Sequence, residues 1–255
     1  MAVVPAAAQA LAVLRYLGAQ AQPAAAAAIS RELDLPRSTT YHLLDTLVQA
    51  GFVVHVTEER RYALGVAVYE LASGYARQTS LQRLARVPLA ALVDHIGQNA
   101  HLAIMHGRDV IYVIEERATG RPPLITDVGV RLPAHLTASG RAMLALMPTA
   151  QVRALFAEPG SLVLRNDLGP RSLTALRQLL AEARRQGFAS EDGEVTAGFA
   201  SVAVAASDRT GYPAAAVAVT FPSAEADPRT RARLAARAAR TAAEVSRRLG
   251  APGQA

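Results

Sequence analysis

The first 65 residues restrict the fold most, because three helical patterns are followed there by two short β-prone runs. Leucines recur at helical spacing before a glycine, which predicts a first helix over 6–17. A proline suited to the first turn opens a second helix over 23–33. The run 34–36 then breaks the chain, and a third helix follows over 36–50. Helix, short turn and helix in this order form a helix-turn-helix motif.

The third helix divides into a face for the core and a face for a partner. At about 100° per residue, Leu43, Leu44 and Leu47 fall on one arc with Thr40 and face the core. A recognition helix reads base edges mainly with its N-terminal residues, while hydroxyls and the helix N-terminus contact phosphates. The predicted DNA contacts on this helix are Arg37, Ser38, Thr39, Thr40, Tyr41 and His42.

A β-hairpin is predicted directly after the third helix. Residues 52–56 are β-prone, 57–60 form a polar turn, and 61–64 return as a second strand. This hairpin is a wing, and we predict that Arg60 and Arg61 contact phosphates near its tip. The alternative is a generic three-helix unit with solvated arginines.

The net charge does not by itself identify the DNA-binding part. The chain has 27 basic and 21 acidic residues, a net charge of +6, and its basic side chains are all Arg. The first 64 residues hold five arginines and five acids, so these charges cancel. Much of the excess lies between Arg229 and Arg248. An arginine-only, alanine-rich composition indicates a coding bias toward GC-rich codons more than a nucleic-acid surface.

The composition also excludes several kinds of site. The chain contains no cysteine, which excludes disulfides, thiolate nucleophiles and Cys-ligated zinc. The N-terminus lacks the pattern of a secretory signal. No apolar run approaches the roughly 18 residues of a membrane span. We therefore expect a cytoplasmic protein that does not bind a membrane.

Several segments together resemble a known family. Residues 35–47, 51–53 and 61–65 resemble the N-terminal domain of the IclR family of bacterial transcription regulators. Residues 131–135 and 138–142 resemble the family's middle motif, and 187–194 with Gly198 resemble its late motif. The similarity covers nearly the whole chain. It implies a DNA-binding regulator, repressor or activator, whose second domain is GAF-like and binds a small effector.

The remaining chain reads as an α+β domain in which helices flank a mixed sheet. We expect helices over 81–96, 139–147 and 173–186, strands over 101–105, 110–115, 195–206 and 214–221, and a closing helix that ends near 249. The predicted division is a winged helix-turn-helix over 1–64, a linker helix over 65–80, an effector-binding domain over 81–250 and a disordered tail over 251–255.

The resemblance also implies an effector site. Ala138 and Ser139 open a short helix whose backbone N–H groups would receive a carboxylate, since helix N-termini favour anions. The implied lining residues are Ala138, Ser139, Gly140, Glu191, Ser201, Ala218 and Thr220. Glu191 and Ala218 make this pocket less suited to a compact anion than hydroxyls would. We expect an aromatic or short-chain acid with an apolar body, held at one end by Ser139, Ser201 or Thr220.

Other interpretations of these residues stay open. Ser201 and Thr220 are also ordinary small residues for strands, and Glu191 fits a solvated acidic loop. Two positions depart from the family pattern. Tyr41-His42 stands where the family often has His-Arg, and Ala200-Ser201 stands where it commonly has Arg-Cys.

The alternative function is a small-molecule hydrolase, or another enzyme, fused to a DNA-binding domain. A serine nucleophile needs a base within hydrogen-bond reach. Ser139 lies in Thr-Ala-Ser-Gly with no partner signature, and the six histidines are scattered. His101 and His106 lack the i, i+4 helical spacing of a zinc protease. We therefore expect no catalysis, no metal and no cofactor.

The expected partners are double-stranded DNA, a small effector and further copies of the chain. One helix-turn-helix contacts few base pairs, so specific binding usually needs two copies on a two-fold site. We predict a homodimer, pairing into a tetramer, on a pseudo-palindromic operator. Effector binding would then alter operator affinity through the linker helix.

Overall fold

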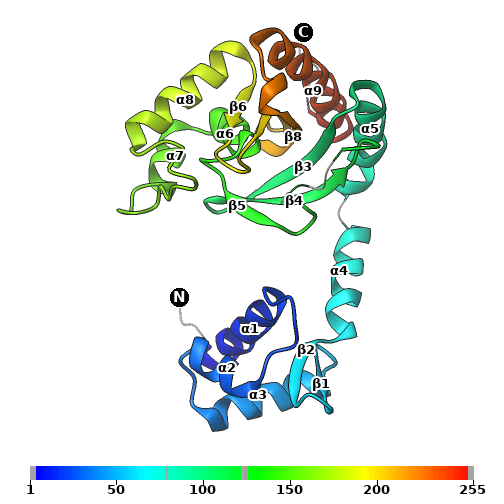
Figure 1. Cartoon of the computed structure of the whole chain (residues 1–255), viewed down its shortest axis with the longest axis vertical. Helices are drawn as coiled ribbons and strands as arrows, with labels where there is room; N and C mark the ends of the chain where they lie inside the picture. The colour runs from blue at the N-terminus through cyan, green and yellow to red at the C-terminus, as the bar shows by residue number, and fades with distance from the viewer. Residues whose placement is uncertain (1–3, 79, 122–123, 125, 252–255) are drawn as a thin grey trace. The chain divides into compact units, whose positions relative to one another are not determined.

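The computed structural model describes residues 4–78, 80–121, 124 and 126–251 (Figure 1). The chain divides into two compact units, residues 1–79 and 80–255. Each unit is described by itself. Within the described residues, no helix is both long enough and apolar enough to cross a bilayer.

The N-terminal unit is a three-helix bundle with a hairpin and one further helix. Its elements are α1 (Pro5–Gly18), α2 (Ala26–Glu32), α3 (Arg37–Gln49), β1 (Val53–Val56), β2 (Arg61–Leu64) and α4 (Val66–Gln78). The core is made by apolar residues of all three helices and the hairpin, including Val13, Ile29, Leu44 and Val53. The predicted linker helix, 65–80, corresponds to α4.

The second helix begins later than the sequence predicts, at Ala26 instead of Pro23. Ala24 is extended there because its backbone pairs with Tyr62 of β2, with N···O distances of 2.9 and 2.8 Å. The turn between α2 and α3 is held by the Ser30 hydroxyl, which donates to the Leu35 carbonyl at 2.7 Å. Asp34 adopts a left-handed conformation in this turn, with φ of 50°.

The C-terminal unit contains a six-stranded sheet between helices. Its elements are α5 (Ser80–Ile96), β3 (Asn99–His106), β4 (Asp109–Glu116), β5 (Arg131–Pro133), α6 (Ala138–Leu146), α7 (Thr149–Leu155), α8 (Leu173–Gln186), β6 (Ala189–Asp192), β7 (Phe199–Ser207), β8 (Pro213–Pro222), the short 3-10 helix η1 (Ser223–Glu225) and α9 (Pro228–Arg248). The α+β class is confirmed. Only Ala251 of the predicted disordered tail, 251–255, lies within the described residues.

The prediction of a mixed sheet is wrong, because every strand pair described is antiparallel. The strand order is β5-β4-β3-β8-β7-β6. Chain neighbours build two antiparallel halves, and β8 then pairs antiparallel with β3 in the middle of the sheet. The helical connection from β5 to β6 joins opposite edges of the sheet, so it makes no parallel pair of neighbours.

Helices cover both faces of this sheet (Figure 1). On one face, α5 and α9 pack on large apolar residues such as Leu102, Val202 and Val217. On the other face, α6 and α8 pack over small residues, among them Ala103, Ala203, Ala216 and Ala218. The small side chains let α6 lie close to the strands. The same face carries the pocket described below.

Candidate functional site

The N-terminal end of α3 presents an open, polar surface. Arg37, Ser38, Tyr41 and His42 are exposed, and Thr39 is half-buried. The helix is preceded by Pro36, which makes no side-chain cap hydrogen bond. The first backbone N–H groups of α3 therefore lack a capping side chain and can meet a phosphate.

The prediction that Thr40 contacts DNA is wrong. Its side chain is fully buried in the core of the N-terminal unit. Its hydroxyl donates to the Pro36 carbonyl at 3.1 Å. Thr40 therefore stabilises the start of α3 from within and cannot reach DNA.

The two wing arginines differ in their surroundings. Arg60 is exposed in the turn between β1 and β2 and has a positive φ of 53°. Arg61 is also exposed, but its Nη1 donates to the Pro23 carbonyl at 3.2 Å. This bond ties β2 to the segment before α2. Arg61 thus offers a phosphate fewer free N–H groups than Arg60 does.

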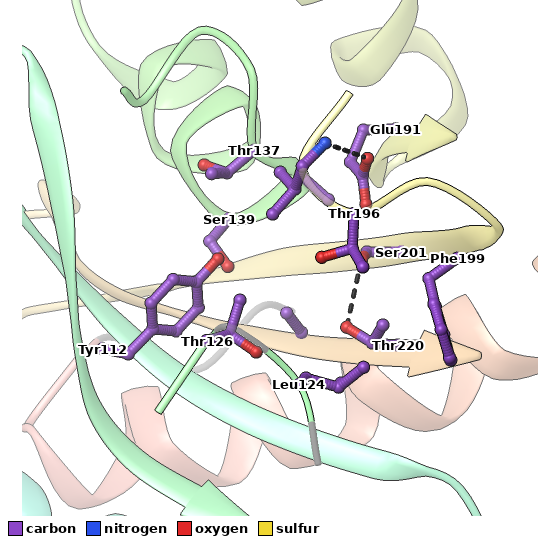
Figure 2. Close-up of a pocket in the computed structure, with 13 residues that line it drawn as sticks. Tyr112, Leu124, Thr126, Thr137, Ser139, Glu191, Thr196, Phe199, Ser201 and Thr220 are labelled. Carbon is purple, nitrogen blue, oxygen red and sulfur yellow. Dashed lines mark hydrogen bonds between the residues drawn. The ribbon is translucent and has the colours of Figure 1, made fainter. Parts of the chain in front are cut away.

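A pocket opens in the C-terminal unit between α6 and the sheet (Figure 2). Its enclosed volume is about 10 Å³, and the space between its walls reaches about 340 Å³ only when the part open to solvent is counted. Its lining residues are Tyr112, Leu124, Thr126, Thr137, Ala138, Ser139, Glu191, Val195, Thr196, Phe199, Ser201, Ala218 and Thr220. Every residue that the family resemblance implied is among them except Gly140.

Strand register brings three of the implied residues side by side. Glu191 of β6 lies opposite Ser201 of β7, and Ser201 lies opposite Thr220 of β8. Side chains of directly paired residues project from the same face of a sheet. The Ser201 and Thr220 hydroxyls are hydrogen-bonded at 3.0 Å, as Figure 2 shows. These three residues form one polar end of the pocket.

The start of α6 forms a second polar region. Thr137 caps the helix and accepts a hydrogen bond from the Gly140 N–H at 2.9 Å. The preceding N–H groups, of Ala138 and Ser139, have no partner within the helix. The Ser139 hydroxyl is buried and faces the Tyr112 hydroxyl, with which it interacts. Two adjacent buried hydroxyls beside free helix N–H groups form a polar cluster that a ligand oxygen could join.

Gly140, which the family resemblance implied as a lining residue, does not line the pocket. A Cβ at this position would lie 2.2 Å from the Ala134 carbonyl oxygen. The residue therefore allows α6 to approach the segment before it. Its N–H is already taken by Thr137, so Gly140 shapes the helix start without contacting the pocket.

Glu191 is a buried carboxyl with few partners. Its Oε2 accepts one hydrogen bond, from the Val195 N–H at 3.3 Å. Burial raises its pKa to about 7, while a contact with Ser201 opposes the shift and the charge of Glu194 adds to it. Near neutral pH this carboxyl therefore exists in both protonation states, and its neutral form can donate a hydrogen bond to a ligand.

Arg141 was not predicted as a site residue, yet it holds the pocket wall. Its buried guanidinium donates to the carbonyls of His135 at 2.8 Å and Ser190 at 2.7 Å. It also pairs with Glu194 at 2.9 Å. These bonds fix the segment that carries Glu191 against α6. The Gly-Arg pair after Ser139 is visible in the sequence, but its three partners depend on the tertiary fold.

The structure adds Tyr112, Leu124, Thr126, Thr137, Val195, Thr196 and Phe199 to the lining. Tyr112 lies on the strand predicted over 110–115, and the alternation of that strand is the one signal that would have found it. Its pKa is raised by burial and by the charge of Glu191, while its hydrogen bond with Ser139 opposes the shift. The described residues include no group of three or more His, Cys, Asp or Glu able to hold a metal ion.

Comparisons with known proteins agree on one family. The model of the IclR helix-turn-helix domain matches residues 6–57, and that of the bacterial transcriptional regulator IclR C-terminal domain matches 73–247. The probable transcriptional regulator SauR of Cupriavidus necator is 33% identical over 224 residues, which cover 86% of each chain. The transcriptional repressor IclR of Escherichia coli is 27% identical, over 76% of this chain and 71% of its own.

Solved structures agree with the fold. A putative IclR-type regulator from Silicibacter sp. TM1040 superposes with a TM-score of 0.84 at 25% identity, over 97% of both chains. An IclR homologue from Microbacterium hydrocarbonoxydans, solved with 4-hydroxybenzoate, superposes with a TM-score of 0.80 at 23% identity. That likeness covers 96% of this chain and 99% of the homologue. With both family models matching in order and most of the chain covered, this protein belongs to the IclR family of bacterial transcription regulators and is a DNA-binding protein.

Proposed function

We propose that the chain controls transcription by binding a pseudo-palindromic operator with α3 and the wing, and that a small organic acid in the pocket of the C-terminal unit modulates this binding. The observation that carries the proposal is Ser139. Its hydroxyl is buried, faces the Tyr112 hydroxyl and lies next to the open N-terminus of α6. A carboxylate would satisfy the hydroxyl and the helix N–H groups together.

The pocket favours a ligand with an apolar body between polar ends. Leu124, Val195, Phe199 and Ala218 supply apolar walls. The far end, at Glu191, suits a neutral hydroxyl or carbonyl better than a second anion, because an ionised Glu191 would repel an anion. The homologue from Microbacterium hydrocarbonoxydans was solved with 4-hydroxybenzoate, which has this layout, so we take this compound as the first probe.

We propose that the chain acts by binding and not by catalysis. A serine nucleophile needs a base that accepts its proton. The Ser139 hydroxyl interacts with Tyr112, whose pKa is raised by burial, so the phenol stays protonated at neutral pH and cannot accept that proton. This pairing therefore supports ligand recognition over the alternative of a fused hydrolase.

The DNA contacts that we propose are those of the predicted set that remain accessible: Arg37, Ser38, Thr39, Tyr41, His42, Arg60 and Arg61. We propose a homodimer that pairs into a tetramer and acts in the bacterial cytoplasm, where its DNA lies. Two copies would place two recognition helices on the two halves of the operator. The connection between the units runs through α4, and the effector signal would pass along it.

Fluorescence anisotropy tests the proposal. The protein is titrated against the DNA upstream of its own gene, at two salt concentrations and with unrelated DNA as competitor. Tight binding that survives the competitor and changes on addition of 4-hydroxybenzoate supports it. Binding that disappears with salt or competitor reflects only arginine electrostatics and would reject specific recognition of that DNA. Specific binding that no organic acid changes would reject effector control.

A further inference from the structure

Tyr112 is a buried tyrosine held in place by its backbone and by its ring. It lies on β4 opposite Ala103 of β3 and packs in the core on the α6 side of the sheet. Its backbone N–H donates to the Val130 carbonyl at 3.1 Å, and its carbonyl accepts from the Gly129 N–H at 2.8 Å. The ring packs edge-on against His101, with centroids 5.5 Å apart. These contacts fix the direction of the phenol hydroxyl.

The Tyr112 hydroxyl points toward the Ser139 hydroxyl, with which it interacts (Figure 2). Both residues line the pocket. Ser139 is the second residue of α6, where the backbone N–H groups of Ala138 and Ser139 have no partner within the helix. The phenol, the serine hydroxyl and two N–H groups therefore lie together at one end of the pocket. The sequence motifs do not include Tyr112.

The groups at this end of the pocket are hydrogen-bond donors. Burial and the charge of Glu191 raise the pKa of Tyr112, so its phenol keeps its proton at neutral pH. A hydroxyl donates one hydrogen bond and also accepts, so one of the two hydroxyls can donate to the other in the empty pocket. The second hydroxyl proton and the two N–H groups are then left for a ligand that accepts.

A carboxylate changes the balance of these hydrogen bonds. Each hydroxyl can turn and donate to a carboxylate oxygen instead of bonding to the other hydroxyl. Hydrogen bonds to an ionised acceptor are roughly twice as strong as those between neutral groups. Binding of an acid therefore replaces one neutral bond with two charge-assisted bonds. An amide offers a neutral oxygen and an NH₂ group that itself donates, so it brings no such gain.

We propose that Tyr112 is a specificity-determining residue that donates a hydrogen bond to the carboxylate of the effector together with Ser139. This pair makes the pocket select a carboxylic acid over the corresponding amide. The inference rests on the proposed effector function. It adds to the site a residue that the family resemblance does not imply.

Calorimetry with 4-hydroxybenzoate and 4-hydroxybenzamide tests this selection. We choose about pH 6, where Glu191 with its pKa of about 7 is mostly neutral and the benzoic acid is ionised. Wild type should prefer the acid. Tyr112→Phe keeps the ring and should weaken binding of the acid by about tenfold, while binding of the amide stays nearly unchanged. Tyr212→Phe is the matched control, because that hydroxyl accepts from Gln151 in an exposed contact.

A second variant shows whether the two hydroxyls act together. Ser139→Ala should weaken binding of the acid by a similar factor. The double variant should lose more than the two single losses combined, because each single variant no longer has the neutral hydroxyl–hydroxyl bond to break. Losses that simply combine would contradict the paired hydroxyls.

NMR of protein labelled with ¹³C at the tyrosine Cζ tests the contact directly, and Tyr112→Phe assigns the signal. On addition of 4-hydroxybenzoate, the Tyr112 signal should move toward the value of a phenolate, because the phenol then donates to a charged oxygen. The amide should move it little, and the Tyr212 signal should not move with either compound. A Tyr112 signal that stays unchanged in the complex with the acid would overturn the proposal.

The outcomes separate this inference from the proposed function. Equal preference for the acid in wild type and Tyr112→Phe would reject the role of Tyr112 and leave effector binding intact. Equal loss of acid and amide binding in Tyr112→Phe would indicate a purely structural role and also reject it. Failure of wild type to bind either compound would reject the proposed ligand class and with it this inference.

Discussion

At the scale of single residues, the site depends on polar groups held away from water. Glu191, Ser139 and His101 are all buried, and each has at least one polar atom that the fold leaves poorly paired or unpaired. Such groups lower stability unless a ligand pairs with them. Glu191 and Ser139 line the same pocket, so their burial is better explained by ligand binding than by folding.

The raised pKa of Glu191 makes stability depend on pH. The carboxyl binds its proton more tightly in the folded chain, with a pKa of about 7, than at its ordinary value of 4.5. The folded state therefore holds more protons between these values, and this group's contribution to stability falls as pH rises from 4.5 to 7. Glu191→Gln has no carboxyl to titrate at this position, so the variant does not lose this stability as pH rises. Its stability relative to wild type should rise by up to about 3 kcal/mol over that window.

Urea unfolding at several pH values measures this gap. The same substitution at the exposed Glu58 is the control for removal of a carboxyl as such. A gap between Glu191→Gln and wild type that stays constant with pH would contradict a buried, proton-binding carboxyl. The variant should also bind 4-hydroxybenzoate with little pH dependence, since no ionised Glu191 remains to repel it.

On the proposed DNA-binding surface, Arg37 is a single residue whose contribution can be tested in the same way. It is exposed in the first turn of α3 and makes no ion pair described in the structure. Arg37→Ala should weaken operator binding by about 1–3 kcal/mol if the guanidinium reads a base. Affinity for 4-hydroxybenzoate should not change. Arg153→Ala removes an equal charge from an exposed site in the C-terminal unit, and an equal loss of operator affinity in that control would mean that Arg37 acts through charge alone.

At the scale of helices and strands, the shape of the pocket depends most on the position of α6. Its start is fixed by the Thr137 cap, by close packing at Gly140 and by the three bonds of Arg141. The helix must approach the sheet closely for its N-terminus to face Glu191 across the pocket. Small residues on the facing strands make that approach possible.

Gly140→Ala tests this packing. The added Cβ would lie 2.2–2.6 Å from backbone atoms of Ala134, so the helix start must move. We expect a loss of about 3 kcal/mol in the free energy of unfolding of the C-terminal unit, together with weaker ligand binding. Gly18→Ala, whose Cβ would meet only Leu64 at 3.7 Å, is the matched control. Equal stability of the Gly140 variant and wild type, measured by calorimetry, would contradict this role of Gly140.

The helices and strands also show how much of the fold can be predicted from the sequence. The three helices and the wing follow from local patterns of leucine, proline and glycine, and the prediction of each is confirmed within a few residues. The late start of α2 was not predictable, because it depends on pairing between Ala24 and Tyr62. The antiparallel sheet was missed for the same reason, since β3 and β8 meet across more than a hundred residues.

The pocket residues likewise divide into those that the sequence motifs identify and those that they do not. The family motifs mark Ser139, Glu191, Ser201 and Thr220, because these lie in recognisable runs of sequence. They do not mark Thr126, whose place in the lining depends on its contact with His101 of β3. Gly140 lies within a motif, yet its N–H and its missing Cβ serve packing, which a motif cannot distinguish from ligand contact.

At the scale of the whole molecule, two binding events share one chain and must be linked. If the effector changes operator affinity by a factor, the operator must change effector affinity by the same factor. We expect calorimetric titrations of 4-hydroxybenzoate, with and without saturating operator DNA, to give the ratio found by anisotropy. Unequal ratios would mean that the compound acts at a site other than the one titrated.

The central pairing of β3 with β8 has a consequence for synthesis on the ribosome. The N-terminal unit is complete within the first 79 residues, and its contacts are local, so it can fold early. The sheet of the C-terminal unit stays in two halves until β8, ending at Pro222, has emerged. A nascent or prematurely terminated chain would therefore contain a folded winged helix-turn-helix before the pocket that binds the effector has formed.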